Sequence, residues 1–237
     1  MTQAYPEDCL QGLVGSWWTD TKDLEVRRGH LLWAFVTHTS QIPYEFIPEG
    51  RGDDPTNHST AKHRVEPMDL SRSSPSARLP VAGLPLNPGE RFGVYRGKVR
   101  PVLLFSEGGL VVEQEHRRRG APWQTSSNLL VAPYYGADAS ASRGGWKQPF
   151  VDRIRRCEYP QYFWDCLPMG PPGASILRLD NLQPIGRDPG SYTWTPHRLS
   201  ADAVKIMDEW IAWLLSGELA LAGALHAARG LFSELAP

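Results

Sequence analysis

The sequence predicts a mainly β protein with helices, of the α+β class, and three observations support this. The chain contains 21 Pro and 22 Gly in 237 residues, which favours turns over long helices in its middle part. Several short runs there are rich in large apolar and β-branched residues, as buried strands are. The end of the chain has helical spacing instead. Short strands joined by long loops and followed by helices predict a small barrel or curled sheet with helices packed on it.

The first 40 residues predict a helix and a strand. The segment Tyr5–Thr19 has Pro6 in its first turn, two acidic residues next to it and apolar residues at helical spacing, so it predicts a short helix. The segment His30–His38 reads HLLWAFVTH and follows a glycine, which predicts a buried strand.

Between Ile42 and Asn87 no hydrophobic period is sustained. This part is rich in Pro, Ser and charged residues, and it predicts a long surface excursion with a short strand near His63–Met68.

After Pro88 the pattern becomes strongly β. Gly89–Ser106 predicts a strand, a glycine turn and a second strand, and Asn128–Ala137 predicts another strand that ends at glycine. Between them, residues 113–127 form a polar loop. Pro149–Trp164 alternates roughly and predicts one more strand, and Ser175–Gly186 predicts a clearer one.

The C-terminal part predicts two helices. In the first, Ser200 is the expected N-cap and Gly217 the expected end. Its apolar stripe consists of Val204, Met207, Ile211 and Leu214. A second helix, rich in Ala and Leu, is predicted over residues 218–235.

Composition excludes several classes of protein. A formal net charge of −1 gives no global attraction to nucleic acid or to anionic membranes, so such a partner requires a local patch. Cys9, Cys157 and Cys166 are too few and too scattered for a disulfide framework or a zinc site. No basic-then-apolar leader and no apolar run long enough to span a membrane is present. The expectation is a soluble cytoplasmic protein without membrane association.

Five segments occur in an order that resembles a known family. They are RRGHLLWAFV (27–36), VRPVLLFS (99–106), LLVAPYYG (129–136), SILRLDNLQPIG (175–186) and the helix that begins HRLSADAV at residue 197. Together they cover about half of the chain and resemble the MazF/PemK family of toxin ribonucleases. In that family an Arg-Pro-Val-Leu strand, a Val-Ala-Pro strand and a Ser-hydrophobic-Leu-acid strand precede a closing helix.

The resemblance implies a fold, an activity and partners. The fold would be a small SH3-like barrel of the MazF/PemK/CcdB type over residues 24–217, with an insertion at about 40–88. Residues 1–23 and 218–237 would be helical extensions. The activity would be that of a hydrolase, an endoribonuclease cleaving single-stranded RNA as the toxin of a toxin–antitoxin pair. The resemblance also implies a homodimer, an antitoxin partner, and no metal or other cofactor.

The residues expected to be catalytic are Arg100, Tyr135 and His116. Arg100 matches the catalytic arginine of the family; its planar fork can hold two phosphate oxygens and stabilise the charge that develops on them. Pro101 cannot extend a ladder, so it starts the strand and leaves Arg100 at the rim. Tyr135 stands where the family has its catalytic threonine, and a phenol is a poor base at neutral pH. His116 carries an imidazole, the group suited to proton transfer there.

A local basic patch is predicted around these residues. The run Arg117, Arg118 and Arg119 is the densest in the chain, and with Trp123 it could bind a single-stranded backbone and stack a base. Arg96, Lys98 and Lys147 are expected to extend the patch. The structural alternative is that these side chains are solvated loop and strand-end residues.

Two other functions remain open. The missing threonine and the large insertion are compatible with a catalytically degenerate barrel that binds nucleic acid or a protein target, as CcdB-type toxins do by binding without catalysis. A metal-dependent enzyme is the other, with Asp53, Asp54, His58 and His63 of the insertion as ligands, although their spacing is loose.

Overall fold

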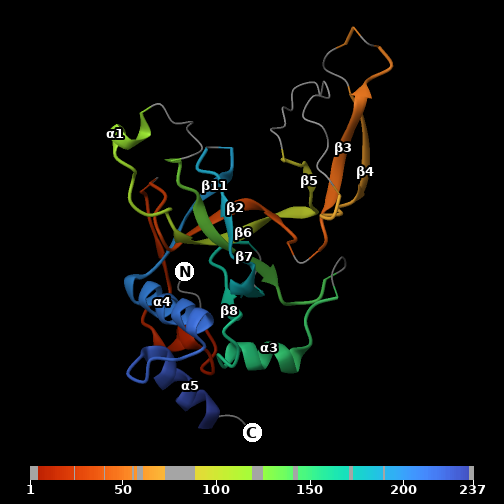
Figure 1. Ribbon diagram of the computed structural model, residues 1–237. Helices are drawn as coiled ribbons and strands as arrows, with labels where there is room; N and C mark the ends of the chain where they lie inside the picture. Colours follow the sequence, from red (N-terminus) through yellow and green to blue (C-terminus); the bar gives the residue numbers. More distant parts are fainter. Residues whose placement is uncertain are drawn as a thin grey trace. The chain divides into compact units, whose positions relative to one another are not determined.

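The computed structural model describes residues 5–23, 25–39, 41–54, 56–57, 61–72, 89–118, 125–140, 144–170, 173–188 and 190–234. The chain divides into two compact units. The larger contains residues 1–35 and 99–237, and the smaller contains residues 36–98. The class is mixed α+β, with mainly strands and a few helices (Figure 1).

The strands are β1 (Trp18–Asp20), β2 (His30–Thr37), β3 (Tyr44–Arg51), β4 (Ala61–Pro67), β5 (Gly93–Val94), β6 (Gly97–Ser106), β7 (Leu129–Gly136), β8 (Tyr162–Cys166), β9 (Ala174–Arg178), β10 (Gln183–Ile185) and β11 (Tyr192–Leu199). The helices are α1 (Gln114–Arg117), α3 (Gln148–Arg155), α4 (Ala201–Ser216) and α5 (Ala224–Glu234), with 3-10 turns η1 (Leu10–Leu13) and η2 (Leu179–Asn181).

The larger unit is built on a curled antiparallel sheet. Its strand order is β1-β11-β2-β6-β7-β9-β8, and β10 pairs with β7. The segment before β1 lies against β8 at the other end of this order, because Gln11 Nε2 donates to the Trp164 carbonyl oxygen at 2.5 Å and the Trp17 ring stacks on Phe163 at 5.3 Å. The sheet therefore curls far enough to bring its first and last strands close together.

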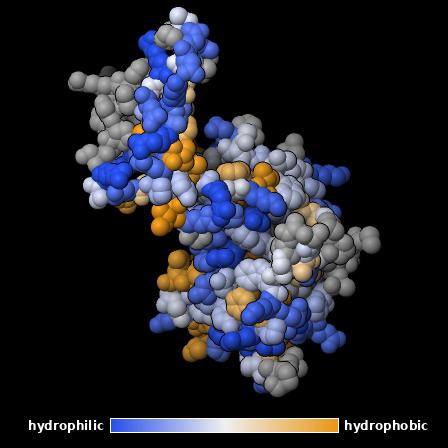
Figure 2. Space-filling model, turned by 90° about the vertical axis from the view of Figure 1, so that its right-hand side faces the viewer, coloured by the Kyte–Doolittle hydropathy of each residue, from blue (hydrophilic) through white to orange (hydrophobic). Residues whose placement is uncertain are grey.

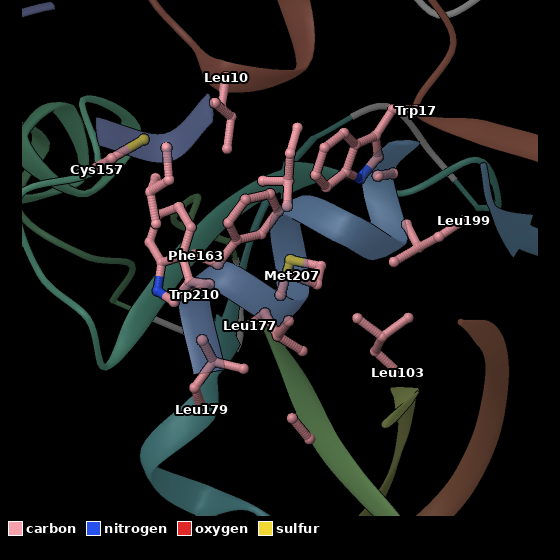
Figure 3. Packing of buried hydrophobic residues seen from close by; sticks show 14 of the residues in the cluster. Leu10, Trp17, Leu103, Cys157, Phe163, Leu177, Leu179, Leu199, Met207 and Trp210 are labelled. Atoms are coloured by element: carbon pink, nitrogen blue, oxygen red, sulfur yellow. The ribbon is translucent and has the colours of Figure 1, made fainter. Parts of the chain in front are cut away.

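The two faces of β8 and β9 are covered by different helices. Phe163 pairs with Leu177 and Trp164 with Ile176, so alternation sends one pair to each face. Phe163 and Leu177 belong to the main core (Figure 3). Trp164 and Ile176 belong instead to a second cluster, which includes residues of α3.

Helices α4 and α5 close the main core. Met207 and Trp210 of α4 and Phe232 of α5 are almost fully buried against the sheet, and the Trp210 indole N–H donates to the Pro160 carbonyl oxygen at 2.9 Å. The caps predicted for α4 are confirmed, since Ser200 Oγ accepts from the Ala203 N–H and Gly217 ends the helix with φ +75°. Of the predicted stripe only Met207 is fully buried, and Val204, Ile211 and Leu214 are partly buried beside it. The other buried residues of the helix are Ala203, Ile206, Trp210 and Trp213. The second predicted helix exists as α5 but begins only at Ala224.

The predicted N-terminal helix is wrong. Tyr5–Thr19 contains η1 and the first two residues of β1, and β1 pairs with β11, so Trp18 belongs to the sheet rather than to a helical extension. Glycines inside the segment weaken a helix. A Cβ at Gly12 would also lie 2.9 Å from the Pro6 carbonyl oxygen, so the chain turns too tightly there for any larger residue.

Two strand predictions in the larger unit need correction. Pro149–Trp164 was predicted as one strand, but its first half is α3, with a proline in the first turn, and only its end is β8. Val151 and Ile154, three residues apart, face the sheet together, which is helical spacing. Ser175–Gly186 is broken by η2 into β9 and β10.

The smaller unit contains a three-stranded sheet of order β4-β3-β5. The strand predicted near His63–Met68 is confirmed as β4, but β3 was hidden in the predicted excursion. Charges and Pro48 interrupt its alternation, and the β3–β4 hairpin is buried on few positions. In this unit Arg91 Nη1 and Glu45 Oε2 form a largely buried ion pair at 3.0 Å. Residues 73–88 of the predicted excursion lie outside the described residues.

The surface in Figure 2 is mostly hydrophilic, and its hydrophobic residues form small patches. In the part of the chain that the structure describes, none of the helices combines the length and the apolar character that crossing a membrane requires.

Candidate functional site: an arginine–tyrosine row

The structure brings Arg100 and Tyr135 together. Strand β6 pairs with β7 with Val102 opposite Pro133 and Leu103 opposite Ala132, and the same register continued places Arg100 opposite Tyr135. Facing residues of an antiparallel pair lie on the same side of the sheet. The Arg100 guanidinium carbon accordingly lies 4.0 Å from the centroid of the Tyr135 ring. This distance is a close cation–π contact.

Arg100 contacts the Tyr135 ring but leaves one of its N–H donors, Nε, without a hydrogen-bond partner in the described part of the chain. Its side chain is partly buried, and its Nε is buried with no hydrogen-bond partner among the described residues. No carboxylate in the described ranges forms an ion pair with it. A guanidinium is always charged and offers five donors, so this one keeps unused hydrogen-bonding capacity toward an anion.

A second arginine, Arg178, also lies over Tyr135 and extends the series of cation–π contacts across the sheet. Arg178 of β9 lies over both Tyr135 and Tyr162, at 5.8 and 5.2 Å from the ring centroids. Its guanidinium binds the Asp180 carboxylate through Nε and Nη2, at 2.6 and 2.5 Å, and this hydrogen bonding raises the pKa of Arg178. Asn181 Nδ2 donates to the Tyr135 hydroxyl oxygen at 3.4 Å.

The series of arginine and tyrosine contacts ends at α3. Tyr162 and Tyr159 meet edge to face with centroids 6.3 Å apart, and Arg153 of α3 lies 4.9 Å over the Tyr159 ring. Arg153 is also paired with Glu158 at 2.6 Å. We call these residues the arginine–tyrosine row: Arg100, Tyr135, Arg178, Tyr162, Tyr159 and Arg153.

Next to the row, Trp146 and Phe150 stack on each other at 5.7 Å, and both meet the edge of Tyr162. Lys147, predicted to extend the basic patch, follows Trp146 at the N-cap of α3 and is exposed. This predicted position is therefore adjacent in the chain to the aromatic residues that flank the row.

His116 is not part of the row. It lies in α1, beyond the end of β6 that is farther from Arg100, and it is exposed. Its Nε2 lies 3.4 Å from a Glu115 oxygen and 3.9 Å from a Glu113 oxygen. Arg100 and Ser106 are six residues apart on one strand, a span of about 20 Å at the rise of an extended chain. The expected catalytic set is thus divided between two places.

The other predicted binding residues are spread over the chain. Arg117 and Arg118 are exposed on α1 and directly after it, whereas Arg119 and Trp123 lie outside the described residues. Arg96 and Lys98 belong to the smaller unit, where both are exposed and Arg96 Nε donates to Gln41 Oε1 at 2.9 Å.

The metal-ligand set of the insertion has other partners where it is described. Asp53 is paired with Lys62 at 2.5 Å, Asp54 accepts from Thr56, and the His63 ring stacks on Phe46 at 4.0 Å. His58 lies outside the described residues. Within the described ranges, one cluster of three potential metal ligands is formed, by Glu113, Glu115 and His116, and all three side chains are exposed.

Sequence reasoning did not identify Arg178, Tyr162 or Asn181 as site residues. Strand alternation carried a signal, because Arg178 follows Ile176 by two positions and therefore shares its face of the sheet. Tyr162 could not be assigned in this way, since its strand was placed over a segment that is half helical.

Comparison of the chain with protein-family models, with curated proteins and with solved structures gave no match. What the site does must therefore be argued from its own geometry.

Proposed function

We propose that this chain binds single-stranded RNA along the arginine–tyrosine row and cleaves it without a metal ion at Arg100. The observation that carries the proposal is the Arg100 guanidinium, which is stacked on Tyr135, has no carboxylate partner in the described part of the chain and has a buried, unpaired Nε. A phosphate group that approaches from solvent fits the Nη donors of this guanidinium, and the buried Nε is not one of the donors it can reach.

The stacking on Tyr135 supports this use of Arg100. A guanidinium held over a ring face by a cation–π contact leaves its N–H donors available to an approaching ligand. The ring also restricts the rotation of a long side chain, which reduces the entropy lost when a phosphate binds. Arg178 and Arg153 are already paired with acids, so Arg100 supplies the strongest free positive charge of the row.

The aromatic members of the row suit the bases of a single strand. Tyrosine and tryptophan rings stack on bases without sequence preference, and arginine planes do the same. Tyr162, Tyr159 and Trp146 are partly buried, so each ring is fixed by its neighbours and still reaches the surface.

In the cleavage step, the 2′-oxygen attacks the adjacent phosphorus while the bond from phosphorus to the 5′-oxygen breaks. The proton of the 2′-hydroxyl passes to a base and the 5′-oxygen takes up a proton. Arg100 stabilises the negative charge on the phosphoryl oxygens, an effect typically worth 10²–10³-fold in rate, or about 3–4 kcal/mol.

Binding without cleavage is the second candidate, and a different observation favours it. Tyr135 replaces the family's threonine and lies under the guanidinium, and in the described ranges no imidazole contacts Arg100 or Tyr135. A row without a proton acceptor would hold RNA and leave it intact.

The finer fold assignment belongs to the same proposal. We infer that the curled sheet is a divergent SH3-like barrel of the MazF/PemK type, and that the chain acts as a homodimeric toxin with an antitoxin partner. The Arg-Pro-Val-Leu run inside β6 and the closing helix α4 support this inference.

The test is end-mapping of a mixed single-stranded RNA pool in EDTA, combined with affinity measurements over a range of salt concentrations. Wild type should leave 2′,3′-cyclic phosphate ends. Arg100→Ala should lose cleavage and lower the salt slope of binding by about 0.7, the value for one phosphate contact on a single strand.

Arg187→Ala is the matched control, because Arg187 is an exposed arginine of the same unit that lies outside the row and donates to Ser127. Binding that depends on Arg100 without any cut would select the second candidate. RNA affinity unchanged by Arg100→Ala would reject both.

A further inference from the structure

A pocket lies where the two ends of the curled sheet approach each other. Its volume is about 730 Å³, and its wall is formed by the chain before β1, by β1 itself and by the segment that follows β8, with His197 of β11 at one side. Small-molecule sites in proteins occupy roughly 300–1,000 Å³, and the mouths of curled sheets are a common place for them.

One wall of the pocket is fixed by hydrogen bonds to strand β8. Tyr5 and Gln11 line it, and both are tied to β8. The Tyr5 hydroxyl donates to Asp165 Oδ1 at 3.2 Å, and Gln11 Nε2 donates to the Trp164 carbonyl oxygen. Asp165 is fully buried and also accepts from the Tyr134 hydroxyl at 3.1 Å. The pocket is therefore a formed feature of the fold rather than a gap between loose segments.

The rest of the lining is aromatic and apolar. Trp17 and Trp18 are among the lining residues, with Trp17 mostly buried in the core behind the wall, and Val14, Leu167 and Pro168 add aliphatic surface. Such walls favour a ligand with a flat or compact apolar body.

The permanently charged side chain among the lining residues is acidic. No lysine or arginine is among its lining residues, while Asp20 contributes a carboxylate. Asp20 Oδ1 lies 2.9 Å from His197 Nδ1, which orients the imidazole, and the Asp20 side chain is otherwise well exposed. An anion would meet the Asp20 carboxylate and the His197 imidazole that contacts it, whereas a cation would meet that carboxylate together with Trp18.

We propose that this pocket binds a small organic cation, an amine or amidine carried on an aromatic or aliphatic body. The body fills the space beside Trp18, and the charged group lies at the rim beside Asp20. Tryptophan is the best aromatic partner for a cation, and a carboxylate adds direct attraction. The site is separate in its residues from the arginine–tyrosine row, and its occupation does not depend on RNA binding.

The experiment compares three probes of nearly equal shape and different charge: benzylamine, benzyl alcohol and benzoate. Each is titrated into the ¹⁵N-labelled full chain while the indole N–H signals of its nine tryptophans are followed. Single Trp→Phe substitutions assign the signals. Benzylamine should shift the signals of Trp17 and Trp18 saturably, benzyl alcohol should bind more weakly, and benzoate should shift neither. The signal of Trp33, which lies on β2 away from the pocket lining, is the internal control.

Asp20→Asn should weaken benzylamine binding by about fivefold, the upper range for an exposed ion pair. Asp188→Asn removes an exposed carboxylate outside the lining and should leave it unchanged, as should Arg100→Ala. Three results would each overturn the proposal. They are an absence of saturable shifts with benzylamine, equal affinity for benzyl alcohol, and full affinity in the Asp20→Asn variant.

Discussion

The two faces of the β7–β9–β8 part of the sheet differ in chemistry although the same strands supply both. On one face Tyr134, Leu177 and Phe163 form a row that α4 and α5 cover. Tyr135, Arg178 and Tyr162 are their neighbours in sequence and lie on the other face, where they belong to the arginine–tyrosine row. On that face α3 covers only part of the sheet.

The difference shows what helix coverage does to polar groups. On the covered face Asp165 is fully buried, and the donors that reach its carboxyl group are the neutral Tyr5 and Tyr134 hydroxyls and the Gln11 amide. Where coverage is partial, arginines stay charged and lie on tyrosine rings. A stable core and an arginine-rich surface can thus share three strands, because alternation separates them.

The largest expected effect comes from removing the central side chain of the covered face. Trp210→Ala should lower the free energy of unfolding by about 4 kcal/mol, since it empties a fully buried site and removes the hydrogen bond to Pro160. Phe150→Ala on the α3 face should cost clearly less, because Phe150 is only partly buried. Urea unfolding of both variants measures this, and equal losses would contradict the comparison.

Asp165 makes the covered face sensitive to pH. Burial raises its pKa from 3.8 to about 7, although hydrogen bonds from Tyr134 and Tyr5 act in the opposite direction. The folded state therefore keeps a proton that the unfolded state has already lost. The contribution of this group to stability is complete below the unfolded pKa, and it is lost as pH rises toward 7 and through it.

The free energy of unfolding should fall by up to about 1.4 kcal/mol per pH unit between these two pKa values. Asp165→Asn should flatten this dependence, because an amide stays neutral and the Tyr134 hydroxyl can turn to accept a hydrogen bond from it. Urea unfolding at several pH values checks this. A wild type without any such slope would show that Asp165 ionises normally in the fold.

A smaller effect is expected on the open face. Tyr135→Leu removes the ring under Arg100 and should weaken single-stranded RNA binding about tenfold, which is within the range for one stacking residue. Tyr135→Phe keeps the ring and should bind nearly as wild type. Fluorescence anisotropy with a short RNA compares them, with Tyr192→Leu on β11 as a tyrosine control outside the row. Equal RNA affinities for the Leu and Phe variants would mean that the Tyr135 ring does not contribute to binding.

The smallest effect is expected at the start of α4. Ser200→Ala removes the hydrogen bond from the Ala203 N–H to Ser200 Oγ and should cost about 1 kcal/mol of stability. RNA affinity should not change, because the cap lies on the covered side. A matching loss of RNA affinity would mean that the two faces are coupled, and thermal unfolding together with anisotropy distinguishes these outcomes.

The sequence by itself determined much of the fold. The strands β2, β6 and β7, the helix α4 with both its caps, and the mixed α+β class follow from local patterns, because a buried strand or an amphipathic helix is encoded by neighbouring residues. Elements whose signal depends on distant partners were missed. Strand β1 exists because it pairs with β11, and β3 carries interruptions that its pairing with β4 and β5 overcomes.

The candidate site divides in the same way. Arg100 was identifiable from the Arg-Pro-Val-Leu run, and Tyr135 from its place in the Val-Ala-Pro segment. The prediction that Pro101 starts the strand is wrong, because β6 begins at Gly97 and both Arg100 and Pro101 lie inside it. Only the tertiary structure brought Arg178 and Tyr162 beside them, placed His116 elsewhere and formed the pocket between β1 and β8. Local sequence sets which face a side chain takes, but strand order and curl decide which side chains from distant segments meet on that face. These depend on contacts between segments more than 100 residues apart, such as that of Gln11 with Trp164.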